Sequence, residues 1–90
     1  MDITEIRSTI KKIIAKTTNI QPESISDTAS FRDDLGLDSL ATLEIGIDVD
    51  YQFKLNLPEE EMEKIRTVED AVVLVVRRLA EKETAKETAV

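Results

Sequence analysis

Cysteine and histidine are both absent from this 90-residue chain, and their absence removes several classes of function. Without cysteine there is no disulfide, no thiolate metal site and no cysteine nucleophile. Without histidine the chain lacks the commonest general base and the commonest ligand of transition metals. We therefore expect neither a catalytic residue nor a metal site, and an enzyme is the weakest interpretation of the sequence.

Long apolar runs and an excess of basic charge are also missing. No run approaches membrane-spanning length, and the amino terminus lacks the basic and apolar regions of a secretion signal. Nineteen acids outnumber 12 lysines and arginines, which gives a net charge of −7 and a pI near 4.5. Nucleic acids and anionic membranes would repel such a chain. We expect a cytoplasmic monomer that does not insert into membranes and whose partners are basic proteins.

Apolar residues recur at intervals of three and four in two segments, which is the pattern of an amphipathic helix. The first helix is expected over residues 2–17, with Asp2 as its cap. Its apolar stripe consists of Ile3, Ile6, Ile10, Ile13 and Ile14. The last helix is expected to follow a capping box made by Thr67 and Asp70. Its buried stripe is expected to consist of Val68, Ala71, Val72, Val75, Val76 and Leu79.

The rest of the chain predicts a long loop, a short helix and a tail. Residues 17–38 lose the helical period and are rich in turn-forming residues. Apolar residues are spaced to pin this loop to the core, namely Ile20, Ile25, Phe31, Leu35 and Leu37. Pro58 and the glutamates after it suit the first turn of a short helix that reaches about Ile65. Residues 1–83 are expected to form one domain, and the polar residues 84–90 a frayed tail. The fold class is therefore all-α, a small four-helix bundle of three longer helices and one short helix.

The segment from Ser39 to about Lys54 carries two apolar stripes instead of one. Residues on a helix advance by about 100°, which places the two stripes roughly 200° apart. The first stripe consists of Ile45, Val49 and Phe53. The second consists of Leu40, Leu43, Ile47 and Tyr51, and it is bordered by Glu44, Asp48 and Asp50. Because so small a bundle cannot easily bury both, the second stripe favours a docking face for partners. The alternative is that neighbouring helices and the loop bury both stripes.

The junction before this helix combines a turn-permitting glycine with a helix cap. Gly36 permits a backbone turn that a side chain would resist, and Asp38 is a preferred cap for a helix beginning at Ser39. The Ser39 hydroxyl would then be exposed at a helix start. Unpaired N–H groups and the positive end of the helix dipole favour a phosphate ester there. An ordinary capped helix is the alternative.

The wider context of this junction resembles the modification-site signature of acyl carrier proteins. That signature, an acidic loop leading to Gly-x-Asp-Ser-Leu, is similar to residues 31–40, FRDDLGLDSL. The resemblance extends over nearly the whole chain, through Leu43-Glu44, Phe53, residues 57–60 (LPEE) and residues 67–71 (TVEDA). It implies the carrier-protein fold and a 4'-phosphopantetheine arm on Ser39, beside Asp38. A separate magnesium-dependent phosphopantetheinyl transferase would supply the arm from coenzyme A.

The resemblance implies a carrier and not an enzyme. Such a protein shuttles acyl thioesters between acyl-transferring or acyl-modifying enzymes with basic docking surfaces, in fatty acid, polyketide or specialised lipid biosynthesis. Gly46, Ile47, Tyr51 and Gln52 depart from the primary fatty-acid carriers, which favours a dedicated carrier. A non-carrier helical interaction module is one alternative. An aminoacyl or peptidyl carrier is another, although its site usually reads Gly-Gly-His/Asp-Ser. The acyl cargo, the pathway and the partner enzymes cannot be read from the sequence.

Overall fold

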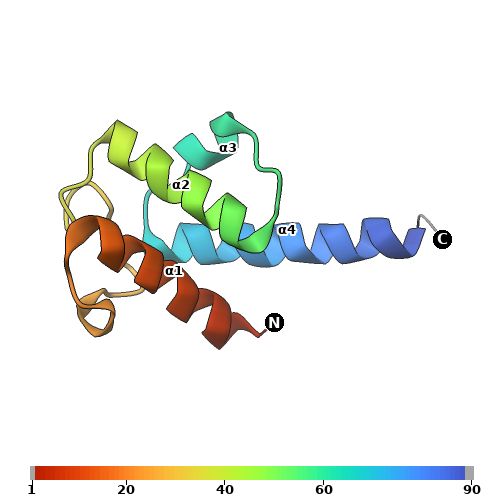
Figure 1. Ribbon diagram of the computed structural model, residues 1–90, viewed down its shortest axis with the longest axis horizontal. Helices are drawn as coiled ribbons and strands as arrows, with labels where there is room; N and C mark the ends of the chain where they lie inside the picture. Colours follow the sequence, from red (N-terminus) through yellow and green to blue (C-terminus); the bar gives the residue numbers. More distant parts are fainter. Residues whose placement is uncertain (1, 89–90) are drawn as a thin grey trace.

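Four α-helices and one 3-10 turn make up the computed structural model, which describes residues 2–88, with side chains as far as Lys82. In chain order the elements are α1 (Ile3–Thr18), η1 (Pro22–Ser24), α2 (Ser39–Phe53), α3 (Glu59–Glu63) and α4 (Val68–Thr88). Figure 1 shows α1, α2 and α3 gathered against one part of α4, which continues beyond them. The all-α bundle of three longer helices and one short helix is confirmed, with its long first loop between α1 and α2.

Side-chain caps begin three of the helices, as the sequence predicts. The Asp2 carboxylate accepts a hydrogen bond from the Glu5 amide at 2.9 Å. At α4 the capping box is reciprocal, since the Asp70 amide donates to the Thr67 hydroxyl and the Thr67 amide donates to the Asp70 carboxylate. Each such bond satisfies an amide that the helix itself leaves unpaired. The cap of α2 is described with the site.

The core combines one face from each long helix with the apolar residues of the loop. From the helices come Ile6, Ile10, Ile14, Ile45, Val49, Phe53, Val68, Ala71, Val72 and Val75. From the loop come Ile25, Ala29, Phe31 and Leu37. The prediction that the Ile45 stripe of α2 faces inward is confirmed. The inclusion of Val76 in the buried stripe of α4 is wrong, because this side chain is 39% exposed. Neighbouring Leu74 is buried in its place.

Backbone hydrogen bonds hold the long loop against the start of α4. Phe31 donates to the Arg66 carbonyl at 2.9 Å, and Val68 donates to the Ala29 carbonyl at 3.2 Å. An isolated antiparallel bridge joins Ser30 to Thr67 between them. Phe31 itself is 2% exposed, so the loop is anchored by both backbone and side chain. This contact fixes the segment that leads into α2.

A cluster of charges ties the same loop to α1. Asp27 lies between Arg7, 3.4 Å away, and Lys11, 2.5 Å away, and Arg7 also pairs with Glu69 of α4. The hydrogen bond from Lys11 is the main reason why the pKa of the Asp27 carboxyl lies below its ordinary value, and the charge of Arg7 adds to the effect. The cluster therefore joins α1, the loop and α4.

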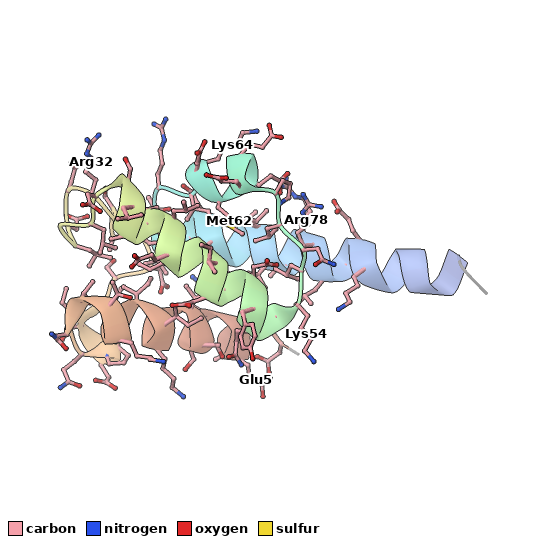
Figure 2. All side chains as sticks on the ribbon, turned by 45° about the horizontal axis from the view of Figure 1, so that its top comes forward. Glu5, Arg32, Lys54, Met62, Lys64 and Arg78 are labelled. Carbon is pink, nitrogen blue, oxygen red and sulfur yellow. The ribbon has the colours of Figure 1, made fainter. Side chains whose placement is uncertain are left out.

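Helix α3 is short, and contacts with α2 and α4 hold it in place. Its Met62 points toward α2, where a Cβ added at Gly46 would lie 3.0 Å from the Met62 Cβ (Figure 2). This close contact explains a glycine in the middle of α2. Arg78 of α4 pairs with Glu61 at 2.6 Å. Met62 is buried, as is Ile65, which lies in the turn after α3 because the helix ends at Glu63.

The far part of α4 is helical as far as Thr88. The division into a domain of residues 1–83 and a frayed tail of residues 84–90 stays a prediction, and residues 89 and 90 lie outside the described part of the chain. Within residues 2–88, none of the helices combines the length and the apolar content that crossing a bilayer requires.

We expect Phe53→Ala to lower the free energy of unfolding by about 3–5 kcal/mol, the usual cost of truncating a buried aromatic side chain. Urea denaturation followed by circular dichroism measures this change. The control is Tyr51→Ala, which truncates an exposed aromatic on the same helix and should change stability by no more than about 0.5 kcal/mol. Equal stability of the parent and Phe53→Ala would contradict the assignment of the inward face.

We expect Asp27→Asn to destabilise the protein at neutral pH and to have a progressively smaller effect in acid. The folded pKa of Asp27 is lowered, so its ion pairs contribute stability above the unfolded pKa and lose it as the pH falls through the folded value. The loss should occur below about pH 4, where an ordinary aspartate titrates.

Urea denaturation of parent and variant across this pH range measures the effect. Asp33→Asn is the control, because the Asp33 carboxylate has no ion-pair partner among the described residues. A difference between parent and Asp27→Asn that stays constant with pH would contradict the role given to the ion pairs.

Candidate functional site

The start of α2 is shaped by a glycine turn and an aspartate cap. Gly36 has φ of 67°, in the left-handed region that residues with a Cβ adopt at a cost. No atom lies within 4 Å of a Cβ added there, so backbone conformation and not space calls for glycine. The next residue, Leu37, is buried and donates to the Phe31 carbonyl at 2.8 Å. Asp38 then caps the helix, accepting from the Ala41 amide at 2.8 Å. Both predicted roles, turn and cap, are confirmed.

Ser39 is the first residue of α2 and is exposed. Its hydroxyl makes no hydrogen bond to any described residue, so a substituent on the oxygen would break no internal bond. Two serine hydroxyls of the loop are occupied. Ser30 accepts from the Asp33 amide at 3.1 Å, and Ser26 accepts from the Thr28 amide at 3.3 Å. Ser39 thus combines an exposed, unengaged hydroxyl with a position at the start of α2.

An open groove of about 810 Å³ lies beside Ser39. Three segments line it: the turn after Ser30, the first residues of α2, and the end of α3 with the linker to α4. The apolar lining consists of Phe31, Leu37, Leu40, Leu43 and Ile65, and the charged lining of Arg32, Asp33, Asp38, Glu63 and Arg66. Figure 2 shows Arg32 at the end of the molecule where α2 begins. The groove can therefore accept a ligand with both apolar and charged parts.

The second stripe of α2 lies mostly in solvent. Leu40 is 65% exposed, Ile47 50% and Tyr51 84%. Leu43 is half-buried and packs partly against the core while lining the groove. The stripe thus forms an apolar strip that starts beside Ser39 and runs along α2.

The acids beside this stripe differ in what they contact. Glu44 and Asp48 are exposed. Asp50 is half-buried, and its carboxylate accepts a hydrogen bond from the Leu57 amide at 3.1 Å. Asp50 therefore orders the connection from α2 to α3, a role that sequence reasoning missed. Glu44 and Asp48 remain as the free charges on the border.

Sequence reasoning also missed the contribution of the α3–α4 linker to the groove. Ile65 and Arg66 of the linker, together with Glu63 at the end of α3, reach it because the bridge between Ser30 and Thr67 brings this segment beside the loop. Pairing between single residues far apart in the chain leaves no periodic signal, so no pattern in the sequence could have found it.

The arrangement offers an acceptor oxygen and no means of activating it. Asp38, the neighbouring carboxylate, is engaged in capping, and the chain contains no histidine. Within the described residues no group of three or more metal-ligating side chains occurs.

Comparison with known proteins places residues 8–75 in a family. They match the model of the family described as "Phosphopantetheine attachment site". The structure is similar to that of the acyl carrier protein from Enterococcus faecalis, a protein described for the structural components of its high thermal stability. The two sequences are 29% identical, the match covers 87% of this chain and 99% of the other, and the TM-score is 0.72.

Proposed function

Because the chain belongs to the phosphopantetheine-attachment family and has the fold of an acyl carrier protein, we propose that it carries acyl groups on an arm attached to Ser39. The family's prosthetic group is 4'-phosphopantetheine, and acyl carrier proteins are carriers and not enzymes. The observation that supports Ser39 is its exposed, unengaged hydroxyl at the start of α2, inside the matched residues.

The residues around Ser39 fit this group. The arm joins a serine through a phosphodiester, and a helix start favours a phosphate because its amides are unpaired and its dipole end is positive. Asp38 keeps the helix start in place through the Ala41 amide. The adjacent groove offers apolar walls to the uncharged part of the arm. When bound, the arm supplies the thiol on which an acyl group is carried as a thioester.

The proposed role in metabolism is the shuttling of acyl thioesters between enzymes of fatty acid, polyketide or specialised lipid biosynthesis. The chain's own residues attach the arm and present it to enzymes that perform the chemistry. The first partner is the phosphopantetheinyl transferase that modifies Ser39. The later partners are enzymes that load, modify or release the acyl group.

We propose that these partners dock on the exposed strip of α2. Leu40, Ile47 and Tyr51 provide its apolar contacts, with Leu43 at its inner edge. Glu44 and Asp48 provide free negative charge beside it. Partners with basic surfaces would be attracted to these carboxylates before the apolar contacts form. Asp50, which the sequence grouped with them, contributes charge but is committed to the Leu57 amide.

We expect Ser39→Ala to abolish loading of the arm while the protein stays folded. The variant loses the acceptor oxygen, and Asp38 still caps α2. Incubation with a promiscuous phosphopantetheinyl transferase and coenzyme A, followed by intact mass measurement, detects the arm. Ser30→Ala is the matched control and should load fully. The proposal would be refuted if the Ser39→Ala variant gained the same mass as the parent.

We expect Glu44→Lys and Ile47→Ala to impair transferase loading in different ways. Reversing a border charge should slow association, most strongly at low salt, because charges separated by more than about 10 Å are screened at 0.1 M. Removing a central apolar contact should speed dissociation with little dependence on salt. Loading rates measured over a series of salt concentrations separate the two effects.

Glu23→Lys is the control for net charge, since it reverses an exposed acid on η1, away from α2. All variants must keep the circular dichroism of the parent. Normal loading by Ile47→Ala, together with a loss of several kcal/mol in stability, would show that this stripe belongs to the core.

A further inference from the structure

Two arginines beside Ser39 stand out in a chain with a net charge of −7. Among the described residues that line the groove, only Arg32 and Arg66 are cationic. Arg7 and Arg78 are held by acids of neighbouring elements, whereas the guanidinium groups of Arg32 and Arg66 have no ion-pair partner among the described residues. Both are exposed, so their charge is free to meet a ligand.

The fold brings these two arginines together from distant parts of the sequence. Arg32 follows Phe31, whose amide donates to the carbonyl of Arg66 at 2.9 Å. The bridge between Ser30 and Thr67 fixes the same two segments side by side. Arg32 and Arg66 are therefore both attached to backbone segments that hydrogen bonds hold in place beside the groove.

The other charged residues of the groove are acids, which would repel a phosphodiester. Asp33, Asp38 and Glu63 also line the groove, and all three are acids. Attachment of the arm to Ser39 adds the negative charge of a phosphodiester to this place. Without the arginines that charge would meet only like charges and the dipole of α2. Guanidinium groups suit it well, because their fork of N–H donors matches the oxygens of a phosphate.

We propose that Arg32 and Arg66 bind the phosphodiester of the arm and thereby hold its first part in the groove. This inference rests on the proposed attachment to Ser39 and assigns the two arginines a positioning role that the attachment alone does not require. The arm would leave Ser39 along the groove between the loop and the α3–α4 linker. Its orientation toward a docked enzyme would then be set before the enzyme arrives.

The decisive experiment compares the unmodified and the modified protein without any acyl cargo. Intact mass first verifies that loading is complete. The Nε–Hε resonances of the arginines are then recorded by ¹H–¹⁵N NMR, with assignments from single Arg→Gln variants. We expect modification to shift the resonances of Arg32 and Arg66. Arg77 is the matched control, because it is exposed, has no ion-pair partner among the described residues and lies away from the groove.

A second readout follows stability. If the arginines bind the arm, modification should raise the melting temperature of the parent. This increase should be smaller in Arg32→Gln and in Arg66→Gln, and smaller still when both substitutions are combined. It should stay at the parent value in Arg77→Gln, which removes the same charge elsewhere. Arg32→Lys should retain part of the effect, since it keeps the charge and loses the fork. Equal melting temperatures of the unmodified variants show that the fold is intact.

The outcomes separate this inference from the proposed function. Failure of Ser39 to load would overturn both. Complete loading without a shift of Arg32 or Arg66 would overturn only the role of the arginines. If the shifts arise only with a malonyl cargo, and with neither the free arm nor an acetyl cargo, the arginines bind a cargo carboxylate and the assignment to the phosphodiester is wrong.

Discussion

The hydrogen bond from Phe31 to the Arg66 carbonyl is the contact on which the position of Ser39 depends. The loop before α2 is long, and its backbone amides and carbonyls need partners wherever they are shielded from water. By pairing with the segment before α4, the loop satisfies them and buries Phe31 at the same time. The turn at Gly36 and the cap at Asp38 start from this fixed point. A groove with walls from two distant segments is the result.

Helix α2 has apolar residues on two faces, one that packs into the core and one that is exposed. Ile45, Val49 and Phe53 complete the core, and Gly46 lets Met62 of α3 approach closely. The outer face leaves Ile47 50% and Tyr51 84% exposed, so both side chains give the fold less burial than the inward residues do. The proposed docking of partner enzymes on α2 would use this exposed apolar surface.

The sequence predicts what periodicity and local chemistry control. The inward stripe of α2, the caps at Asp2 and Asp38 and the turn at Gly36 depend on neighbours within a few residues, and the structure confirms them. The stripe of α1 is confirmed at Ile6, Ile10 and Ile14 and is wrong at Ile3, which lies in the first turn and is 51% exposed. Periodicity fails at Val76, because the width of a buried face is set by the helices that cover it. The partner of Asp50 and the place of Arg66 in the groove depend on how separate segments meet. The proposal of Ser39 as the attachment residue rests on local pattern, whereas the residues that surround it in space could be named only from the fold.

The length of α4 has a consequence for how this carrier could be held. The molecule measures 44 × 25 × 18 Å, and Figure 1 shows α4 continuing along the longest dimension, away from the end where α2 begins. Lys82 on this helix donates to the Lys54 carbonyl at the end of α2, so the far part of α4 is braced against the bundle. A tether attached after α4, such as a solid support or a fused enzyme, would thus be joined to the end of the molecule opposite Ser39. The end of the molecule that contains Ser39 would then face away from the tether.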